Sequence, residues 1–373
     1  MKKEHLPAFA VLIAGGRGTR FWPRSRARTP KQLLNIVGEE TMLRQTWQRL
    51  SPVFPPKRFM VVTNTEQAAS VRQQLRGLPI SQLLAEPTGR NTAAAIGLAA
   101  IHLAHEHGDA LMAVLPADHY ITNGVKYRRL LHTALQLAHE PGTLVVMGIP
   151  PTHPETGFGY VERARTPLSR RSGTPVYEVR RFTEKPSLDV ARRYIASGRY
   201  YWNAGMFFWR VSTFLECLAA FLPATRASLA EISSLIGKPG YERALRRHYP
   251  RLENISVDYA VMERATRNDS LARRYKVVVL PAEMGWSDLG SWSAVYDLLV
   301  RKRGADVTAG PFIGMDTAGN FVWSPKKLVA AIGVRDLILV ETEDAILLCP
   351  RHRAQDVGKI VKWLEERNLR ALL

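Results

Sequence analysis

Short apolar runs and amphipathic segments alternate along the first 120 residues. Four runs predict buried strands, at residues 9–14, 58–63, 81–85 and 110–115. Thr41 suits the N-cap of a helix with apolar positions at 42, 43, 46, 47 and 50, and Asn91 can begin a helix that runs to residue 104. The run at 110–115 has no polar residue, as expected for a strand of parallel sheet covered on both faces. This rhythm predicts a doubly wound, Rossmann-like α/β domain.

The mixed pattern continues to about residue 300 and then stops. Further strands are predicted at 143–149, 176–183, 205–210 and 276–280, and further helices at 212–222, 256–265 and 291–300. The basic cluster 301–304 is typical of a linker. Short β-rich pieces with Gly, Asp and Asn between them follow at 312–315, 320–323, 328–332, 337–341 and 345–348, before an amphipathic helix at 355–370. We therefore expect two domains, 1–300 and 305–373, of which the second is small and β-rich.

The composition permits a large hydrophobic core and indicates the cellular compartment. Of 373 residues, 46% are hydrophobic and 23% are charged, which argues against disorder. No run of about 18 apolar residues occurs, so no transmembrane helix is expected. Lys2 and Lys3 before the first apolar run loosely imitate a signal peptide, but a buried first strand is the better interpretation. Cys217 and Cys349 form no metal or redox motif, which favours inert core thiols in a reducing, cytoplasmic compartment.

The formal net charge of +19 favours anionic partners. Nucleic acid is not expected, because the basic residues are scattered and neither an RNA-recognition motif nor a zinc finger is present. Phosphorylated small molecules are the better candidates. A well-solvated, Arg-rich surface nevertheless accounts for much of the excess charge.

A glycine-rich segment directly after the first predicted strand carries the strongest chemical signal. Gly15, Gly16 and Gly18, followed by Thr19, lie where the backbone can approach a ligand, and their N–H groups can form a nest for an anion. The Walker P-loop pattern is absent. The dinucleotide fingerprint is absent too, because Phe21 stands where that fingerprint needs its third glycine.

Two cations and two carboxylates extend this signal. Arg20 and Lys31 can supply positive charge to phosphate oxygens. Asp118 follows the strand at 110–115, at the end of the sheet where open α/β folds bind ligands, although a helix cap is a plain alternative for it. Asp288 lies in a motif-rich turn. Two carboxylates together with phosphate oxygens make the hard oxygen site that Mg²⁺ prefers.

Seven motifs carry a family resemblance. They are GGRGTRFWP with SR and PKQ at 15–32, EPTGRNTA at 86–93, LPADH at 115–119, TGFGY at 156–160, FTEKP at 182–186, WNAGMF at 202–207 and GWSDLGSW at 285–292. With its motifs in this order, which is the order in the family, the chain resembles the nucleoside-diphosphate-sugar pyrophosphorylases. Within them it is similar to the mannose-1-phosphate guanylyltransferases. The resemblance implies transfer of GMP from GTP to mannose 1-phosphate, with Mg²⁺ held by Asp118 and Asp288. Ala94 and Arg24 depart from the family pattern without touching an expected ligand contact.

The resemblance also implies the sugar contacts. Glu184 is expected to bind sugar hydroxyls and Lys185 the sugar's phosphate, while Asn203 and the backbone near Gly159 hold the sugar. Without the other motifs, the Glu184–Lys185 pair would be interpreted as an exposed turn.

Base choice is assigned to Glu86 as a hypothesis. Guanine presents N1–H and an N2 amine as donors, and an ionised carboxylate only accepts. Asn91 and Thr92 can also contact nucleotide, but capping of the next helix is an equally good interpretation.

The segment after residue 305 resembles the family's small C-terminal domain, on residues 328–329, 333, 336–337 and 344–345. The resemblance implies a left-handed β-helix-like unit with a terminal helix, and a homodimer. Because the sequence ends at Leu373, we expect no isomerase domain of the kind that some relatives carry. Two alternatives stay open: a sister nucleotidyltransferase for another base or sugar, and a catalytically silent regulatory subunit that binds the sugar nucleotide.

Overall fold

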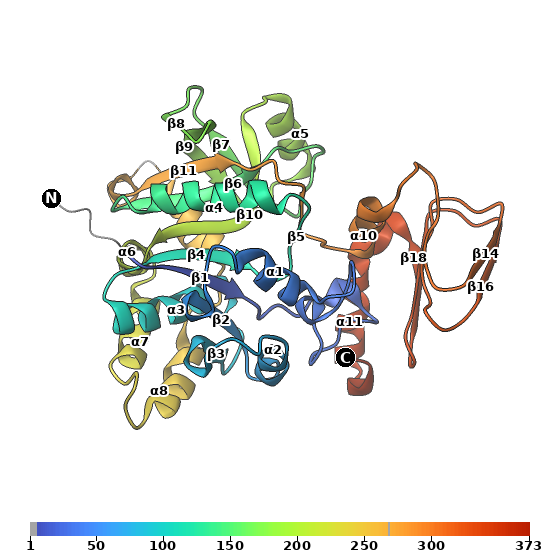
Figure 1. Ribbon diagram of the computed structural model, residues 1–373, viewed down its shortest axis with the longest axis horizontal. Coiled ribbons are helices and arrows are strands. Elements are labelled where there is room, and N and C mark those ends of the chain that lie inside the picture. Colours follow the sequence, from blue (N-terminus) through green and yellow to red (C-terminus); the bar gives the residue numbers. More distant parts are fainter. Residues whose placement is uncertain (1–5, 268) are drawn as a thin grey trace.

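The computed structural model describes residues 6–267 and 269–373, so Lys2 and Lys3 of the signal-like sequence lie outside the described residues. The larger part is built on one sheet (Figure 1), which has ten strands within those ranges. They are β1 (Ala8–Ile13), β2 (Phe59–Asn64), β3 (Leu83–Glu86), β4 (Leu111–Pro116), β6 (Thr143–Ile149), β7 (Tyr160–Arg163), β8 (Ser169–Arg171), β9 (Thr174–Thr183), β10 (Tyr200–Arg210) and β11 (Lys276–Pro281).

The strand order explains why the carboxyl ends of several strands meet. The sheet runs β3-β2-β1-β4-β10-β6-β11-β9-β7, with β8 paired to β9. Strands β3, β2, β1 and β4 are parallel, as the sequence predicts. Strand β10 runs antiparallel between β4 and β6, so the sheet is mixed. Loops that follow β1, β3 and β4 therefore lie along one edge, beside the start of β10.

Helices cover both faces of this sheet (Figure 1). One face packs against α3 (Asn91–His107), α6 (Val211–Phe221), α7 (Pro223–Ser233) and α8 (Tyr241–His248). The other packs against α1 (Met42–Leu50), α2 (Ala68–Gln74), α4 (Gly124–Ala138) and α5 (Leu188–Ala196). Alternation along β1 feeds both cores, because Phe9 and Val11 face the first set and Ala10 and Leu12 the second.

Local signals in the sequence are mostly confirmed. Thr41 caps α1, since its side chain accepts the backbone N–H of Arg44. The helix predicted at 256–265 differs, because it opens as a π-helical turn, η6 (Asp258–Met262), before α9 (Glu263–Ala265). Cys217 is buried, and burial raises its thiol pKa, which fits an inert thiol. Cys349 is only half-buried rather than a full core residue.

A two-stranded ribbon brings distant carboxylates together. Strand β5 (Tyr120–Ile121) follows β4 and pairs antiparallel with β12 (Trp286–Ser287), with Ser287 opposite Tyr120. Asp118 lies just before β5, and Asp288 directly follows β12. The ribbon thus places the two aspartates side by side, although they are far apart in sequence.

The C-terminal part forms successive coils of a β-helix. Its elements are α10 (Trp292–Leu299), which leads into it, then β13 (Val307–Ala309), β14 (Phe312–Met315), β15 (Phe321–Trp323), β16 (Val329–Ile332), β17 (Leu337–Glu341), β18 (Ile346–Pro350), η8 (Arg351–Asp356) and α11 (Val357–Glu366). Strands β13, β15 and β17 stack in parallel, as do β14 and β16. The β-helix-like unit with a terminal helix is therefore confirmed.

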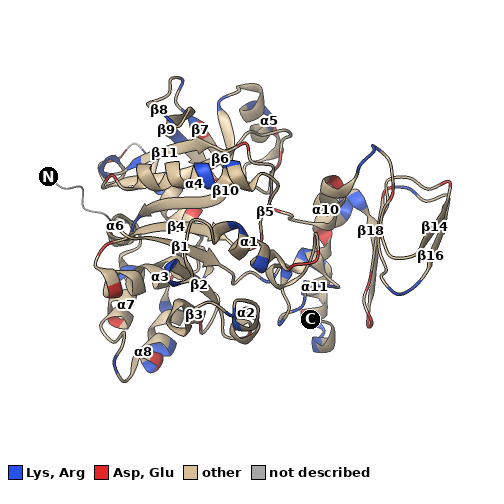
Figure 2. Cartoon of the chain, in the orientation of Figure 1, with Lys and Arg blue, Asp and Glu red and all other residues tan. Residues whose placement is uncertain are grey.

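One hydrophobic core is shared by both parts of the molecule. It joins Phe21 and Trp22, which follow the glycine-rich loop, to α10 and to α11. Its members from the C-terminal part are Phe321, Ile338, Val340, Leu347, Ala354, Val357, Val361 and Leu364. In Figure 1, α11 accordingly lies against the segment that follows β1. Lys and Arg are spread over both parts (Figure 2), in keeping with their scattered positions in the sequence.

Candidate active site

Lys31 connects the two predicted metal ligands. The short helix η2 (Lys31–Leu33) buries the Lys31 side chain, and Nζ donates to Asp118 Oδ2 at 2.8 Å. The same Nζ donates to the backbone carbonyl of Asp288 at 2.5 Å. Three elements that are remote in sequence therefore meet at one ammonium group.

The two aspartates differ electrostatically. Burial alone would raise the pKa of Asp118, but the charge and the hydrogen bond of Lys31 outweigh burial and hold that pKa below the usual aspartate value. For Asp288, burial dominates and raises the pKa, although Lys31 and Arg20 act in the opposite direction. The proximity of Asp118 adds to this upward shift. Asp288 is thus the carboxylate whose charge is less fully compensated by the protein.

The three glycines of the loop meet different surroundings. Gly18 has φ 59°, and a Cβ there would lie 2.4 Å from Lys31 Cβ, so this position allows the loop to pack onto Lys31. A Cβ at Gly15 would lie 2.9 Å from Glu86 Oε2, whereas Gly16 faces open space. Gln32 Nε2 holds the loop from beneath, because it donates to the carbonyls of Ala14 and Gly16.

The loop keeps donors free for a ligand. Within residues 6–267 and 269–373, no backbone N–H from Gly15 to Thr19 donates to another backbone group. Together with the open space at Gly16, this arrangement fits the predicted anion nest.

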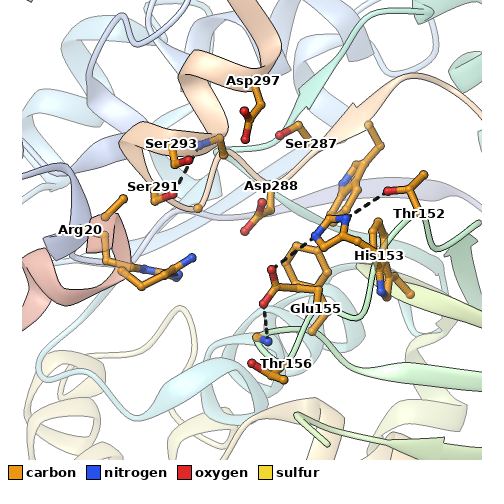
Figure 3. A pocket seen from close by; sticks show the side chains of 18 of the residues that line it. Arg20, Thr152, His153, Glu155, Thr156, Ser287, Asp288, Ser291, Ser293 and Asp297 are labelled. Carbon is orange, nitrogen blue, oxygen red and sulfur yellow. Dashed lines mark hydrogen bonds and ion pairs between the residues drawn. The ribbon is translucent and has the colours of Figure 1, made fainter. Parts of the chain in front are cut away.

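A cavity of about 800 Å³ is lined by five of the fifteen predicted site residues (Figure 3). Arg20 lines it from the loop and points toward Asp288 across the opening. The remaining predicted residues on its wall are Gly159, Glu184, Asn203 and Asp288. A hollow of about 270 Å³ adjoins it, since His119 and Gly205 line both, and it holds Gly16, Thr92 and Asp118.

Glu184 has an unsatisfied oxygen in this cavity. Its Oε1 lies 3.2 Å from Lys185 Nζ, while its Oε2 is buried and has no hydrogen-bond partner within the described chain. Burial, together with the charge of Asp258, raises the pKa of Glu184. Gly159 is required beneath it, because a Cβ there would lie 2.4 Å from Glu184 Oε2. Lys185 adopts a positive φ of 47°, and its side chain is exposed.

Asn203 is held by hydrogen bonds to its neighbours. Its Nδ2 donates to Asp258 Oδ1 at 2.7 Å, its Oδ1 accepts the backbone N–H of Gly205, and its own N–H donates to the carbonyl of Gly159. Burial raises the pKa of Asp258, although the bond from Asn203 opposes the shift. Sequence reasoning missed Asp258, since it lies in none of the seven motifs.

Glu86 lies buried beneath Gly15. The hydroxyl of Tyr249 donates to Glu86 Oε1 at 2.5 Å. Burial raises the pKa of Glu86 to about 7 in spite of that bond. Tyr249 was also missed, because nothing in the sequence links it to position 86.

Asn91 and Thr92 serve the backbone in the structure. Asn91 Oδ1 accepts the N–H of Thr92, which is not the usual N-cap bond to the second or third residue of a helix. Thr92 Oγ1 accepts the N–H of Val257 at 2.8 Å, and Thr92 also lines the smaller hollow. Their predicted nucleotide contacts remain predictions.

Aromatic rings close one side of the cavity. Phe158 packs edge-on against both Trp202 and Trp286, and Trp286 Nε1 donates to His119 Nδ1. Burial lowers the pKa of His119 to about 4, so this ring is neutral near pH 7. Within residues 6–267 and 269–373, no cluster of three or more His, Cys, Asp and Glu could hold a metal ion. Asp118 and Asp288 as metal ligands therefore stay a prediction.

Comparisons with known proteins agree with this fold. The family described as Nucleotidyl transferase matches residues 9–302, and the MannoseP isomerase/GMP-like beta-helix domain matches residues 310–364. The chain belongs to the nucleotidyl transferase family.

Two similar relatives carry the name mannose-1-phosphate guanylyltransferase. A mannose-1-phosphate guanylyltransferase of Klebsiella pneumoniae is 40% identical over 361 residues, which are 95% of this chain and 74% of that protein. One of Escherichia coli K12 is 38% identical over 363 residues, or 96% of this chain and 73% of that protein. A crystal structure described as mannose-1-phosphate geranyltransferase from Thermus thermophilus is 34% identical, with a TM-score of 0.84, and covers 96% of this chain and 100% of that one.

Among the described helices, none combines the length and apolar character needed to cross a bilayer.

Proposed function

We propose that the chain transfers GMP from GTP to α-D-mannose 1-phosphate and releases pyrophosphate. The observation that carries this proposal is the meeting of Lys31, Asp118 and Asp288 beside an open glycine-rich loop. That arrangement supplies a nest, a cation and two carboxylates where a triphosphate would lie. The names of the relatives support guanine and mannose as the particular base and sugar.

Enzymes of this family use divalent metal ions, and the two aspartates fit Mg²⁺. Both are oxygen donors, and Mg²⁺ usually takes one or two protein carboxylates together with phosphate oxygens. Burial raises the pKa of Asp288, and a bound cation would favour its charged form. When bound there by Asp118 and Asp288, the ion would neutralise phosphate charge and polarise the α-phosphate.

The chain's own cations address the main obstacle, which is repulsion between two anions. At ~4 Å and an effective dielectric constant near 20, each pair of like charges costs about 4 kcal/mol. Lys31 would shift part of its bonding from Asp118 to phosphate oxygens as substrate enters, and Arg20 would bind the leaving pyrophosphate. The sugar phosphate oxygen then attacks the α-phosphorus in line, and no covalent enzyme intermediate is needed.

The sugar would be held on the opposite wall. The unpaired Oε2 of Glu184 is positioned to accept a hydroxyl proton, and Lys185 would bind the sugar's phosphate. Asn203 and the backbone of Gly159 would align the ring. Holding both substrates in this order supplies much of the remaining rate enhancement.

Base selection would rest on Glu86, with Asn91 and Thr92 near the nucleotide. One Glu86 oxygen is occupied by Tyr249, and the other lies next to Gly15 at the nest. A guanine edge would have to reach this second oxygen.

We also assign the chain to the cytoplasm and expect a homodimer. The cytoplasmic assignment rests on two cysteines that form no disulfide. The dimer is supported by exposed apolar side chains on β14 and β16, where Ile313, Met315 and Ile332 are 56%, 58% and 70% exposed.

A substrate matrix tests the proposed function. Pyrophosphate release is measured with GTP, UTP, ATP or dTTP, each combined with mannose 1-phosphate or glucose 1-phosphate, in the presence of Mg²⁺. We expect the pair of GTP and mannose 1-phosphate to be fastest, and EDTA to abolish the activity until Mg²⁺ is restored. A faster different pair would indicate a sister enzyme, and no release with any pair would indicate a regulatory subunit.

A further inference from the structure

The C-terminal helical segment contacts the glycine-rich loop at several points. Arg17 Nη2 pairs with Glu365 Oε1, and Trp22 Nε1 donates to the carbonyl of Leu372 at 2.9 Å. Helix α11 also passes directly over the loop, because a Cβ at Gly358 would lie 3.5 Å from Thr19 Oγ1. The shared hydrophobic core anchors both sides of this contact.

Three arginines of the loop region hydrogen-bond to side chains of the C-terminal part, and the partner of one of them is uncharged. Arg17 and Arg26 are paired with carboxylates, those of Glu365 and Asp344. Arg20 instead donates from Nη1 to the neutral amide oxygen of Gln355 at 2.6 Å. Arg20 is also the one of these three that lines the large cavity.

We propose that Gln355 is a positioning residue, which aims the Arg20 guanidinium into the cavity while leaving its positive charge uncancelled. This inference rests on the proposed function, because it assigns Arg20 to the triphosphate. A carboxylate at 355 would hold the same nitrogen but would neutralise the charge that the phosphates need. An amide accepts the hydrogen bond without doing so.

The charged groups next to Gln355 are consistent with a neutral partner for Arg20. Its neighbour Asp356 is engaged by Arg353 and Lys359, so that negative charge is balanced within its own segment. The bond to Gln355 uses Nη1, and the Nε and Nη2 edge of the planar guanidinium can receive a phosphate in a bidentate manner. The C-terminal part would therefore contribute to nucleotide binding through Arg20, from the wall of the same cavity, which Gln355 also lines.

The test compares Gln355→Glu, Gln355→Ala and the matched control Glu365→Gln at low ionic strength, where exposed charges are least screened. We expect Gln355→Glu to raise KM for GTP ~10-fold and Gln355→Ala ~3-fold, with smaller changes in kcat and in KM for mannose 1-phosphate. Glu365 lies on the following helix, α11, and contacts the same loop at Arg17, so Glu365→Gln should leave both KM values within about 2-fold. Thermal unfolding of each variant monitors the fold.

A double-mutant cycle separates positioning from a structural role. In an Arg20→Ala background, Gln355→Glu should no longer change KM for GTP, because the group on which it acts is absent. An unchanged effect in that background, or native KM values for both Gln355 variants, would overturn the proposal.

Failure of the proposed function would give a different result, because the native chain itself would release no pyrophosphate. In that event the same series is measured by equilibrium binding of GTP, and Gln355→Glu should still weaken binding only when Arg20 is present.

Discussion

The two walls of the cavity are built in opposite ways. On the sugar wall, Glu184 and Asn203 stand at the end of β9 and on β10. Asn203 is fixed before any ligand arrives, because it donates to Asp258 and Gly159 and accepts from Gly205. On the phosphate wall, Lys31 and Arg20 are long cations held by partners from remote elements, Asp118 and Gln355. One wall is preorganised by the sheet, and the other depends on exchangeable ion pairs and hydrogen bonds.

This difference suits the two tasks. Recognition of a neutral sugar ring depends on fixed hydrogen-bond geometry, and a buried unpaired oxygen makes the wrong sugar costly. Phosphoryl chemistry depends on charge that can follow the leaving group, so the cations must be able to change partners. Variants on the phosphate wall should therefore lower the rate or weaken GTP binding, whereas variants on the sugar wall should lower selectivity and sugar affinity.

The largest expected effect is at Lys31. Lys31→Met removes the ammonium group that joins Asp118 and Asp288, so kcat/KM should fall by ~10³ or more. Pyrophosphate release measures it. Lys327→Met is the matched control, since Lys327 is ion-paired with Glu341 far from the cavity and should leave kcat/KM near the native value. A Lys31→Met enzyme within 10-fold of native would break the distinction between the walls.

On the sugar wall, Glu184→Gln should lower kcat/KM for mannose 1-phosphate by ~10² and leave KM for GTP within about 2-fold. The amide removes the charge that accepts a sugar hydroxyl but keeps the volume above Gly159. Steady-state kinetics, with the concentration of each substrate varied in turn, measures both quantities. An equal rise in KM for GTP would show that the two walls do not act separately.

Glu86 tests the comparison of the two walls, because it is a buried group on the nucleotide side that Tyr249 already holds in place. Burial raises its pKa to about 7 in the folded chain, so folding favours its protonated form. The resulting contribution to stability is present below the ordinary glutamate pKa and is lost as the pH rises through 7. Glu86→Gln should remove this loss and raise the free energy of unfolding at pH 8 by about 2 kcal/mol relative to native. Urea unfolding at pH 5 and pH 8 measures the free energy of unfolding of both chains. If the difference in free energy between the two pH values is the same in Glu86→Gln as in the native chain, the raised pKa of Glu86 is refuted.

The smallest expected effect concerns the base. ITP lacks the N2 amine of guanine, so its kcat/KM should be ~10-fold below that of GTP. In Glu86→Gln the gap between the two nucleotides should narrow. Equal turnover of GTP and ITP by the native chain would remove the N2 contact from the proposal.

Sequence patterns were sufficient where chemistry is local. The strands β1, β4 and β6, the cap at Thr41 and the short strands of the C-terminal part were predictable, because apolar runs and local polar residues mark them directly. The β-helix arrangement of the C-terminal strands was implied by the family resemblance. The glycine-rich loop and the two aspartates could be named from their motifs.

Partners contributed by other elements were not predictable. Tyr249 reaches Glu86 from the turn after α8, Asp258 reaches Asn203 from a π-helical turn, and Gln355 reaches Arg20 from the C-terminal part. No periodicity or spacing links these pairs, since only the packing of the three cores brings them together. The ribbon of β5 and β12 could not be predicted from the sequence either, because each of its strands has only two residues.

Transfer of label from GTP tests the central proposal most directly. The native chain is incubated with mannose 1-phosphate, Mg²⁺ and GTP labelled with ³²P at either the α or the γ position, and the products are separated. We predict that the α label appears in a sugar nucleotide and the γ label in pyrophosphate. Label from the γ position in the sugar product, or no transfer from either position, would contradict GMP transfer.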